Sequence, residues 1–121
     1  MTYFVSPSQE TEWQLAPSEL AERLSRQWPD AVIRPVENQA SNHSLEWTMT
    51  IDRWRVDGSL DKTGQTVHLD GDIDACAHLA RWLREQVPPQ QELVFYDEAF
   101  SADVALLPTT TEEDLVAPFI R

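Results

Sequence analysis

The sequence predicts one α+β domain over residues 1–121, in which a mostly antiparallel sheet of about five to seven strands carries two amphipathic helices on one face, followed by a short C-terminal helix. Residues 44–51 alternate between apolar and polar side chains, which is typical of a strand with one buried face. Residues 17–28 and 73–87 repeat apolar residues at helical spacing, which predicts two one-sided helices. These apolar surfaces can be buried only against each other, so we expect a two-layer structure.

Three short strands are expected in the first part of the chain, at residues 3–5, 12–15 and 31–36. The third should lie near a sheet edge, because Pro35 has no N–H group to donate to a neighbouring strand.

A helix is expected between the second and third strands, with Pro17 in its first turn and Pro29 beyond its end. The residues on its apolar side are Leu20, Ala21, Leu24 and Trp28. The pairs that can form ion pairs on its polar side are Glu19 with Arg23 and Glu22 with Arg26.

The middle of the chain predicts an antiparallel meander. The inward residues of its first strand, 44–51, are Leu45, Trp47, Met49 and Ile51. After Asp52 the alternation shifts by one residue, which indicates a tight turn or a bulge; we expect the turn, because one uninterrupted strand would be unusually long. A hairpin turn is expected at residues 61–64, with Gly64 at positive φ. The inward residues of the next two strands are Trp54, Val56 and Leu60, then Gln65, Val67 and Leu69.

Residues 68–78, HLDGDIDACAH, raise the question of a metal site, because two histidines flank three aspartates. A calcium-binding loop would need Gly at its sixth position and a bidentate acid at its twelfth, where the chain has Ala75 and Arg81. A zinc site built on Asp74 and His78 has no third ligand nearby. We therefore predict no metal and no cofactor here.

The same residues are better explained as the start of the second helix. Asp72 is expected to be its N-cap, Asp74 to favour the positive end of the helix dipole, and His78 to pair with Asp74. The apolar stripe that follows is Ile73, Cys76, Ala77, Ala80, Leu83 and Val87. Cys76 within this stripe is expected to be an inert packing residue; the alternative is a nucleophilic thiol.

The last part of the chain predicts strands at 92–97 and 104–107 and a short helix within 109–119. Thr110 and Glu113 have the spacing of a capping box at the start of that helix.

Composition excludes several classes of function. The net charge of −12 repels nucleic acids and anionic membranes, so we expect neither as a partner. Residues 1–13 lack the features of a signal peptide, and the single cysteine cannot form an internal disulfide, which favours a cytoplasmic protein. The acidity itself has two explanations, the solubility of a small protein or attraction to a basic protein partner.

One local feature suggests a binding site, the segment FYDEAFSAD at residues 95–103. The predicted partner-binding residues in it are Tyr96, Asp97, Glu98, Phe100 and Asp103. Aromatic rings offer rigid contact area and attract cations, and solvated carboxylates can accept two hydrogen bonds from an arginine. The alternative is that both rings belong to the core and anchor a loop whose acids are only solvated.

Two classes of function stay open. The first is a non-catalytic protein-binding module that presents an acidic face to a basic protein partner; in composition the chain is similar to bacterial immunity and anti-effector proteins, an analogy that carries no residue across. The second is a small enzyme, or a binder of a cationic small molecule, that uses Asp97, Glu98 and Asp103. The sequence contains no nucleophile elbow, phosphate-binding loop, dinucleotide fingerprint or zinc-protease motif, so we favour the first class and predict no catalytic residue.

Overall fold

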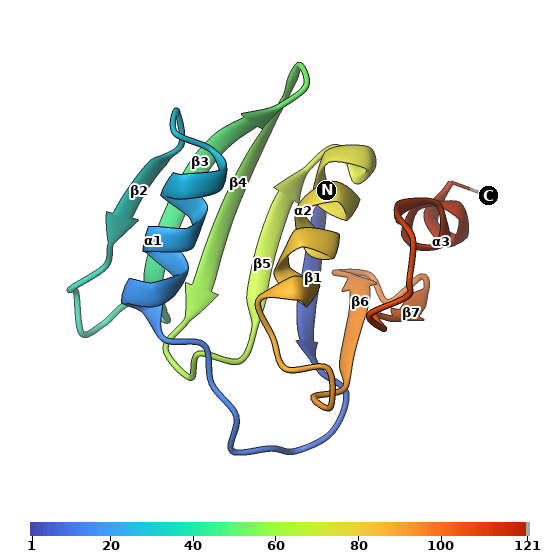
Figure 1. Cartoon of the computed structure of the whole chain (residues 1–121), viewed down its shortest axis with the longest axis horizontal. Helices are drawn as coiled ribbons and strands as arrows, with labels where there is room; N and C mark the ends of the chain where they lie inside the picture. Colours follow the sequence, from blue (N-terminus) through green and yellow to red (C-terminus); the bar gives the residue numbers. More distant parts are fainter. Residues whose placement is uncertain (121) are drawn as a thin grey trace.

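A computed structural model describes residues 1–120 and contains one seven-stranded antiparallel sheet with helices on one of its faces (Figure 1). The elements in chain order are β1 (Thr2–Pro7), α1 (Pro17–Gln27), β2 (Val32–Pro35), β3 (His43–Ile51), β4 (Trp54–Asp61), β5 (Val67–Gly71), α2 (Ile73–Glu85), β6 (Leu93–Asp97), β7 (Asp103–Ala105), α3 (Glu112–Val116) and the 3-10 helix η1 (Ala117–Phe119). The predicted α+β architecture is confirmed, including the short C-terminal helix.

The strand order is β2-β3-β4-β5-β1-β6-β7, and every neighbouring pair is antiparallel. Strands β3 to β5 form the predicted meander, β2 is the edge strand beside β3, and β1 lies between β5 and β6. Tyr3 pairs with Leu69 on one side and with Asp97 on the other, so β1 joins the two parts of the sheet.

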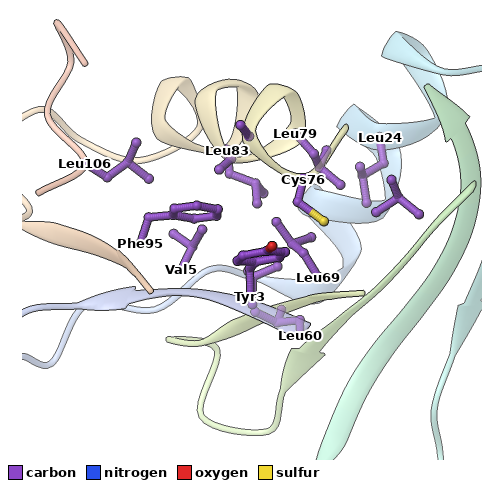
Figure 2. Packing of buried hydrophobic residues seen from close by; sticks show 14 of the residues in the cluster. Tyr3, Val5, Leu24, Leu60, Leu69, Cys76, Leu79, Leu83, Phe95 and Leu106 are labelled. Atoms are coloured by element: carbon purple, nitrogen blue, oxygen red, sulfur yellow. The ribbon is translucent and has the colours of Figure 1, made fainter. Parts of the chain in front are cut away.

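The core lies between the sheet and its two long helices. Helix α1 packs over β2 and β3, whereas α2 packs over β4 and β5 (Figure 1). Figure 2 shows Cys76, Leu79 and Leu83 of α2 pointing toward side chains of β1, β5 and β6. The labelled sheet residues beneath α2 are Tyr3, Val5, Leu69 and Phe95. We call the opposite side of the sheet the open face, because no helix of residues 1–120 covers it (Figure 1).

The meander follows the predicted alternation except at one end. Val56 and Leu60 are buried as expected, and Asp52 (φ 59°) and Gly64 (φ 74°) occupy the predicted turns. Trp54 was predicted to face inward but is 48% exposed. The pairing of β4 with β5 ends at Val56, so no strand lies beside Trp54 on that side.

The strand predicted at residues 12–15 is wrong, because this segment is a loop. Its backbone groups bond outside any ladder: the N–H of Leu15 donates to the carbonyl of Gly64 at 2.7 Å. The side-chain amide of Gln65 donates to the carbonyls of Thr11 and Trp13 at 2.7 and 3.0 Å. A side chain therefore satisfies the polar groups that a neighbouring strand would otherwise satisfy.

Two predicted boundaries near the C-terminus shift. Strand β7 covers residues 103–105, not 104–107, and the capping box joins Thr111 to Asp114, not Thr110 to Glu113. The hydroxyl of Thr110 accepts from the N–H of Leu107 at 2.8 Å and donates to a carbonyl of β7, so it is already used in the turn before the helix. The next threonine therefore takes the cap.

Candidate functional site

The start of α2 explains most of the aspartate-histidine segment. The Asp72 side chain accepts a hydrogen bond from the N–H of Asp74 at 3.0 Å, so Asp72 is the N-cap as predicted. His78 does not pair with Asp74; its Nδ1 lies 3.2 Å from a carboxylate oxygen of Glu112, because α3 packs against this side of α2. Within residues 1–120, no group of three His, Cys, Asp or Glu side chains is placed to hold a metal ion.

Cys76 is fully buried between α2 and the sheet (Figure 2). Burial, as the main cause, raises the pKa of its thiol to about 12, because a thiolate would lose its hydration there. The thiol therefore stays protonated at neutral pH and packs as an apolar group.

The predicted binding corner is brought together in part. Tyr96 and Phe100 stack with their ring centroids 5.4 Å apart, and Phe100 is 77% exposed. Asp103 lies directly across from Tyr96 in the pairing of β6 with β7, and Glu98 is exposed at the end of β6. Four of the predicted residues thus share one accessible corner.

Asp97 departs from this group. Its side chain was expected to be solvated, but it is only 3% exposed and accepts hydrogen bonds from the N–H of Ser101, at 2.7 Å, and from the Ser101 hydroxyl. The hydrogen bond from that hydroxyl is the main reason that the pKa of Asp97 lies below its usual value. Alternation along β6 explains the placement, since Asp97 follows Tyr96 and points to the helix-covered side. It holds the 97–101 turn and is not available to a partner.

The corner continues into a row of rings across the open face. Tyr96 stacks on Phe4 at a centroid distance of 5.2 Å, Phe4 meets His68 edge-on at 4.8 Å, and His68 meets His43 edge-on at 5.3 Å. We call Phe100, Tyr96, Phe4, His68 and His43 the aromatic row. Only the first two were predicted as site residues. The outward positions of Phe4 and His68 were readable from alternation, but their meeting depends on β1 pairing with β5.

Two cavities flank His68 at the end of the row. One, of about 330 Å³, is lined by residues that include Arg34, Glu46, Asp57, Ser59, His68 and Asp70. The other, of about 490 Å³, is lined by Asn42, His43, Asp61, Lys62, Thr63 and His68. The row therefore ends at a hollowed, polar part of the surface.

The surroundings of His68 favour the neutral form of its imidazole. Burial is the main cause that lowers the pKa of His68, and the nearby His43 lowers it further, while Asp61 opposes them. His43 Nδ1 is buried and has no hydrogen-bond partner among residues 1–120. At neutral pH the His68 ring thus carries little positive charge that would repel a cation.

The charge of the C-terminal part of the chain is one-sided. Residues 92–120 contain seven acids and no lysine or arginine, and the acids are Glu92, Asp97, Glu98, Asp103, Glu112, Glu113 and Asp114. This part of the chain therefore supplies more than half of the net charge of −12.

Comparisons with family models, with curated proteins and with solved structures found no match for this chain. Within the described residues, no helix is both long and apolar enough to cross a membrane. The geometry of the site is therefore the basis for the function proposed below.

Proposed function

We propose that this protein is a non-catalytic binding module whose open face receives a basic segment of a protein partner. The observation that carries the proposal is the aromatic row, which runs from the exposed Phe100 across β6, β1 and β5. Rings in a soluble protein are usually buried, so a contiguous row of one exposed and four half-buried rings, with acids at one end, is typical of an interaction surface.

The rings favour a cationic partner for a direct physical reason. The ring face of Phe100 that points away from Tyr96 carries negative quadrupole potential, and a guanidinium held over it gains about 0.5–2 kcal/mol depending on its desolvation. The rings are also held by their neighbours, since Tyr96 lies between Phe4 and Phe100 and its hydroxyl accepts from Ser6 at 3.2 Å. Little side-chain entropy would therefore be lost on binding.

Glu98 and Asp103 supply the charged contacts at this end of the row. Both are exposed, and both can accept a bidentate arginine without disturbing the fold. The wider acidic region of residues 92–120 would attract a basic partner over a longer range and speed its association.

The alternative function, a small enzyme or a binder of a cationic small molecule, is less well supported. It depended on Asp97, Glu98 and Asp103 acting together, and Asp97 is committed to Ser101. A cytoplasmic location is also part of the proposal, because the buried Cys76 is the only thiol and suits a reducing compartment.

The test measures binding of a fluorescent peptide of alternating arginine and leucine, with a peptide of alternating glutamate and leucine as its control. We expect the arginine peptide alone to bind, with an affinity that falls as salt rises from about 0.1 M to 1 M. Replacing the rings (Phe4→Leu with Tyr96→Leu) should weaken binding at least tenfold while circular dichroism stays unchanged.

A charge-matched pair of variants separates the corner from the overall acidity. Glu98→Gln with Asp103→Asn removes two charges beside the row, whereas Glu10→Gln with Glu12→Gln removes two exposed charges from the loop after β1. The first variant should weaken binding several-fold more than the second. Equal effects of the two variants, or binding unaffected by the ring replacements, would show that the open face is not the binding surface.

A further inference from the structure

The C-terminal end of α2 holds a second feature, unrelated to the open face. Arg84 is only 3% exposed, and its guanidinium donates to four backbone carbonyls. These acceptors are the carbonyls of Gln91 (2.7 Å), Leu106 (3.2 Å), Val87 (3.4 Å) and Pro88 (2.5 Å). Among residues 1–120 no carboxylate lies within ion-pair distance of Arg84.

Two N–H groups of adjacent arginines have no acceptor at this place. They are Arg84 Nε and Arg81 Nη1, both buried and both without a hydrogen-bond partner within the described chain. A buried donor that lacks an acceptor destabilises the fold, and more so when the donor is charged. Burial lowers the pKa of the Arg84 guanidinium, and the nearby Arg81 lowers it further.

The arginines line a cavity of about 240 Å³ whose other walls are Glu85, Val87, Pro89 and Pro108. This volume lies somewhat below the range of about 300–1,000 Å³ that is typical of drug-sized ligands. Val87, Pro89 and Pro108 are apolar, so the cavity combines cationic donors with hydrocarbon walls.

We infer that this cavity binds a small aliphatic monocarboxylate, with its carboxylate against the N–H groups of Arg81 and Arg84 and its hydrocarbon part against Val87, Pro89 and Pro108. A guanidinium presents planar donors that match the two oxygens of a carboxylate. An acceptor with a negative charge would satisfy the two unpaired donors and offset two neighbouring positive charges.

The surroundings select a monoanion with a tail. Glu85 stands at the cavity, 4.0 Å from Arg81 Nη2, and repels a second negative charge. The net charge of −12 acts in the same direction. Inorganic phosphate would also leave the apolar walls unfilled, whereas a branched chain of a few carbons would bury them.

The test is an NMR titration of the arginine Nε–Hε signals at constant ionic strength. The probe is 3-methylbutanoate, and its controls are the neutral isostere 3-methylbutanamide and inorganic phosphate. We expect 3-methylbutanoate to shift the Arg81 and Arg84 signals saturably, with a Kd of about 1–10 mM, as suits so small a ligand. The amide and phosphate should bind at least tenfold more weakly.

Variants test whether the shifts of the arginine signals report binding in this cavity. Arg81→Gln should raise the Kd at least tenfold, and Arg81→Lys, which keeps the charge but loses the planar fork, at least threefold. Arg26→Gln, on the exposed side of α1, should leave the Kd unchanged. Two results would overturn the inference by showing the wrong selectivity: amide binding as tight as that of the carboxylate, or phosphate binding as tight or tighter. The absence of a saturable shift would overturn it as well, because water alone would then satisfy the two donors.

Discussion

Trp47 and Gly58 are paired across β3 and β4, and each requires the other. The indole lies over the glycine so closely that a Cβ at position 58 would stand 2.2 Å from Trp47 Cε2. The ring is 1% exposed and is among the largest fully buried side chains of the core. A glycine in a strand interior usually weakens the strand, but here it makes room for the largest side chain.

Trp47→Ala should therefore destabilise the fold by about 3–5 kcal/mol, a large part of the about 5–15 kcal/mol typical of whole domains. Gly58→Ala should cost about 1–3 kcal/mol or more by overpacking. In the double variant the added methyl group enters the space left by the indole, so its loss of stability should be smaller than the sum of the two single losses. Urea denaturation measures all three; strict additivity would mean that the two residues do not share this space.

Asp97 makes stability depend on pH. Its folded-state pKa lies below the about 3.9 of an unfolded aspartate, so it stabilises the fold above that value. This stabilisation is lost as pH falls through the lower, folded pKa. Asp97→Asn should thus lower the melting temperature at pH 6, and the difference from the wild type should shrink as pH falls below about 4. Asp103→Asn, at the exposed side of the same corner, is the control and should lower the melting temperature less at pH 6.

Cys76 should react slowly with a thiol reagent in the native protein and rapidly in denaturant. The thiol is buried and its pKa is raised to about 12, so little thiolate exists and the reagent has no access. The labelling rate with and without denaturant is the measurement. Native labelling at the rate of a free thiol would place Cys76 at the surface.

At the scale of single elements, the Asp72 cap sets where α2 begins. Asp72→Ala removes the acceptor for the N–H of Asp74 and should cost about 0.5–2 kcal/mol. For a domain of this size the melting temperature should fall by roughly 4 °C per kcal/mol. Asp30→Ala, an exposed aspartate outside any helix, is the control. An equal effect of both changes would argue against a role of the cap.

Elements with a strong repeating pattern could be predicted from the sequence. Strand β3 and helices α1 and α2 each present several apolar residues at one spacing, and all three were found. The loop at residues 12–15 could not be predicted, because Gln65, distant in sequence, provides its hydrogen bonds.

The sequence predicted only the part of the candidate site whose residues lie close together in the chain. Tyr96 and Phe100 are four residues apart and stack as neighbours in one corner. Phe4 and His68 join the row because β1 pairs with β5. These two residues are close in space but more than sixty positions apart in the sequence. The pattern of apolar and polar residues does not give the strand order, so these contacts could not be predicted from it.

For the whole molecule, the charge distribution predicts how salt affects stability. A net charge of −12 on 121 residues produces self-repulsion that weakens the folded state. Sodium chloride screens this repulsion, since the Debye length falls from about 30 Å at 0.01 M to about 10 Å at 0.1 M. The melting temperature should therefore rise over this range, and the rise should be smaller in Glu112→Gln with Glu113→Gln. A melting temperature that falls with salt would mean that ion pairs outweigh the repulsion.

The place of β1 between β5 and β6 determines the order of events during translation. Val5 pairs with Val67 and with Phe95, so its two partners leave the ribosome long after it does. At about 5–20 residues per second, both edges of the first strand stay unpaired for several seconds, and the second edge for roughly 5–20 s. During that time Tyr3, Phe4 and Val5 form an extended apolar segment, the kind that chaperones hold and that other nascent chains can join. Strand β1, which links the two parts of the sheet in the folded protein, is thus the strand most exposed during synthesis.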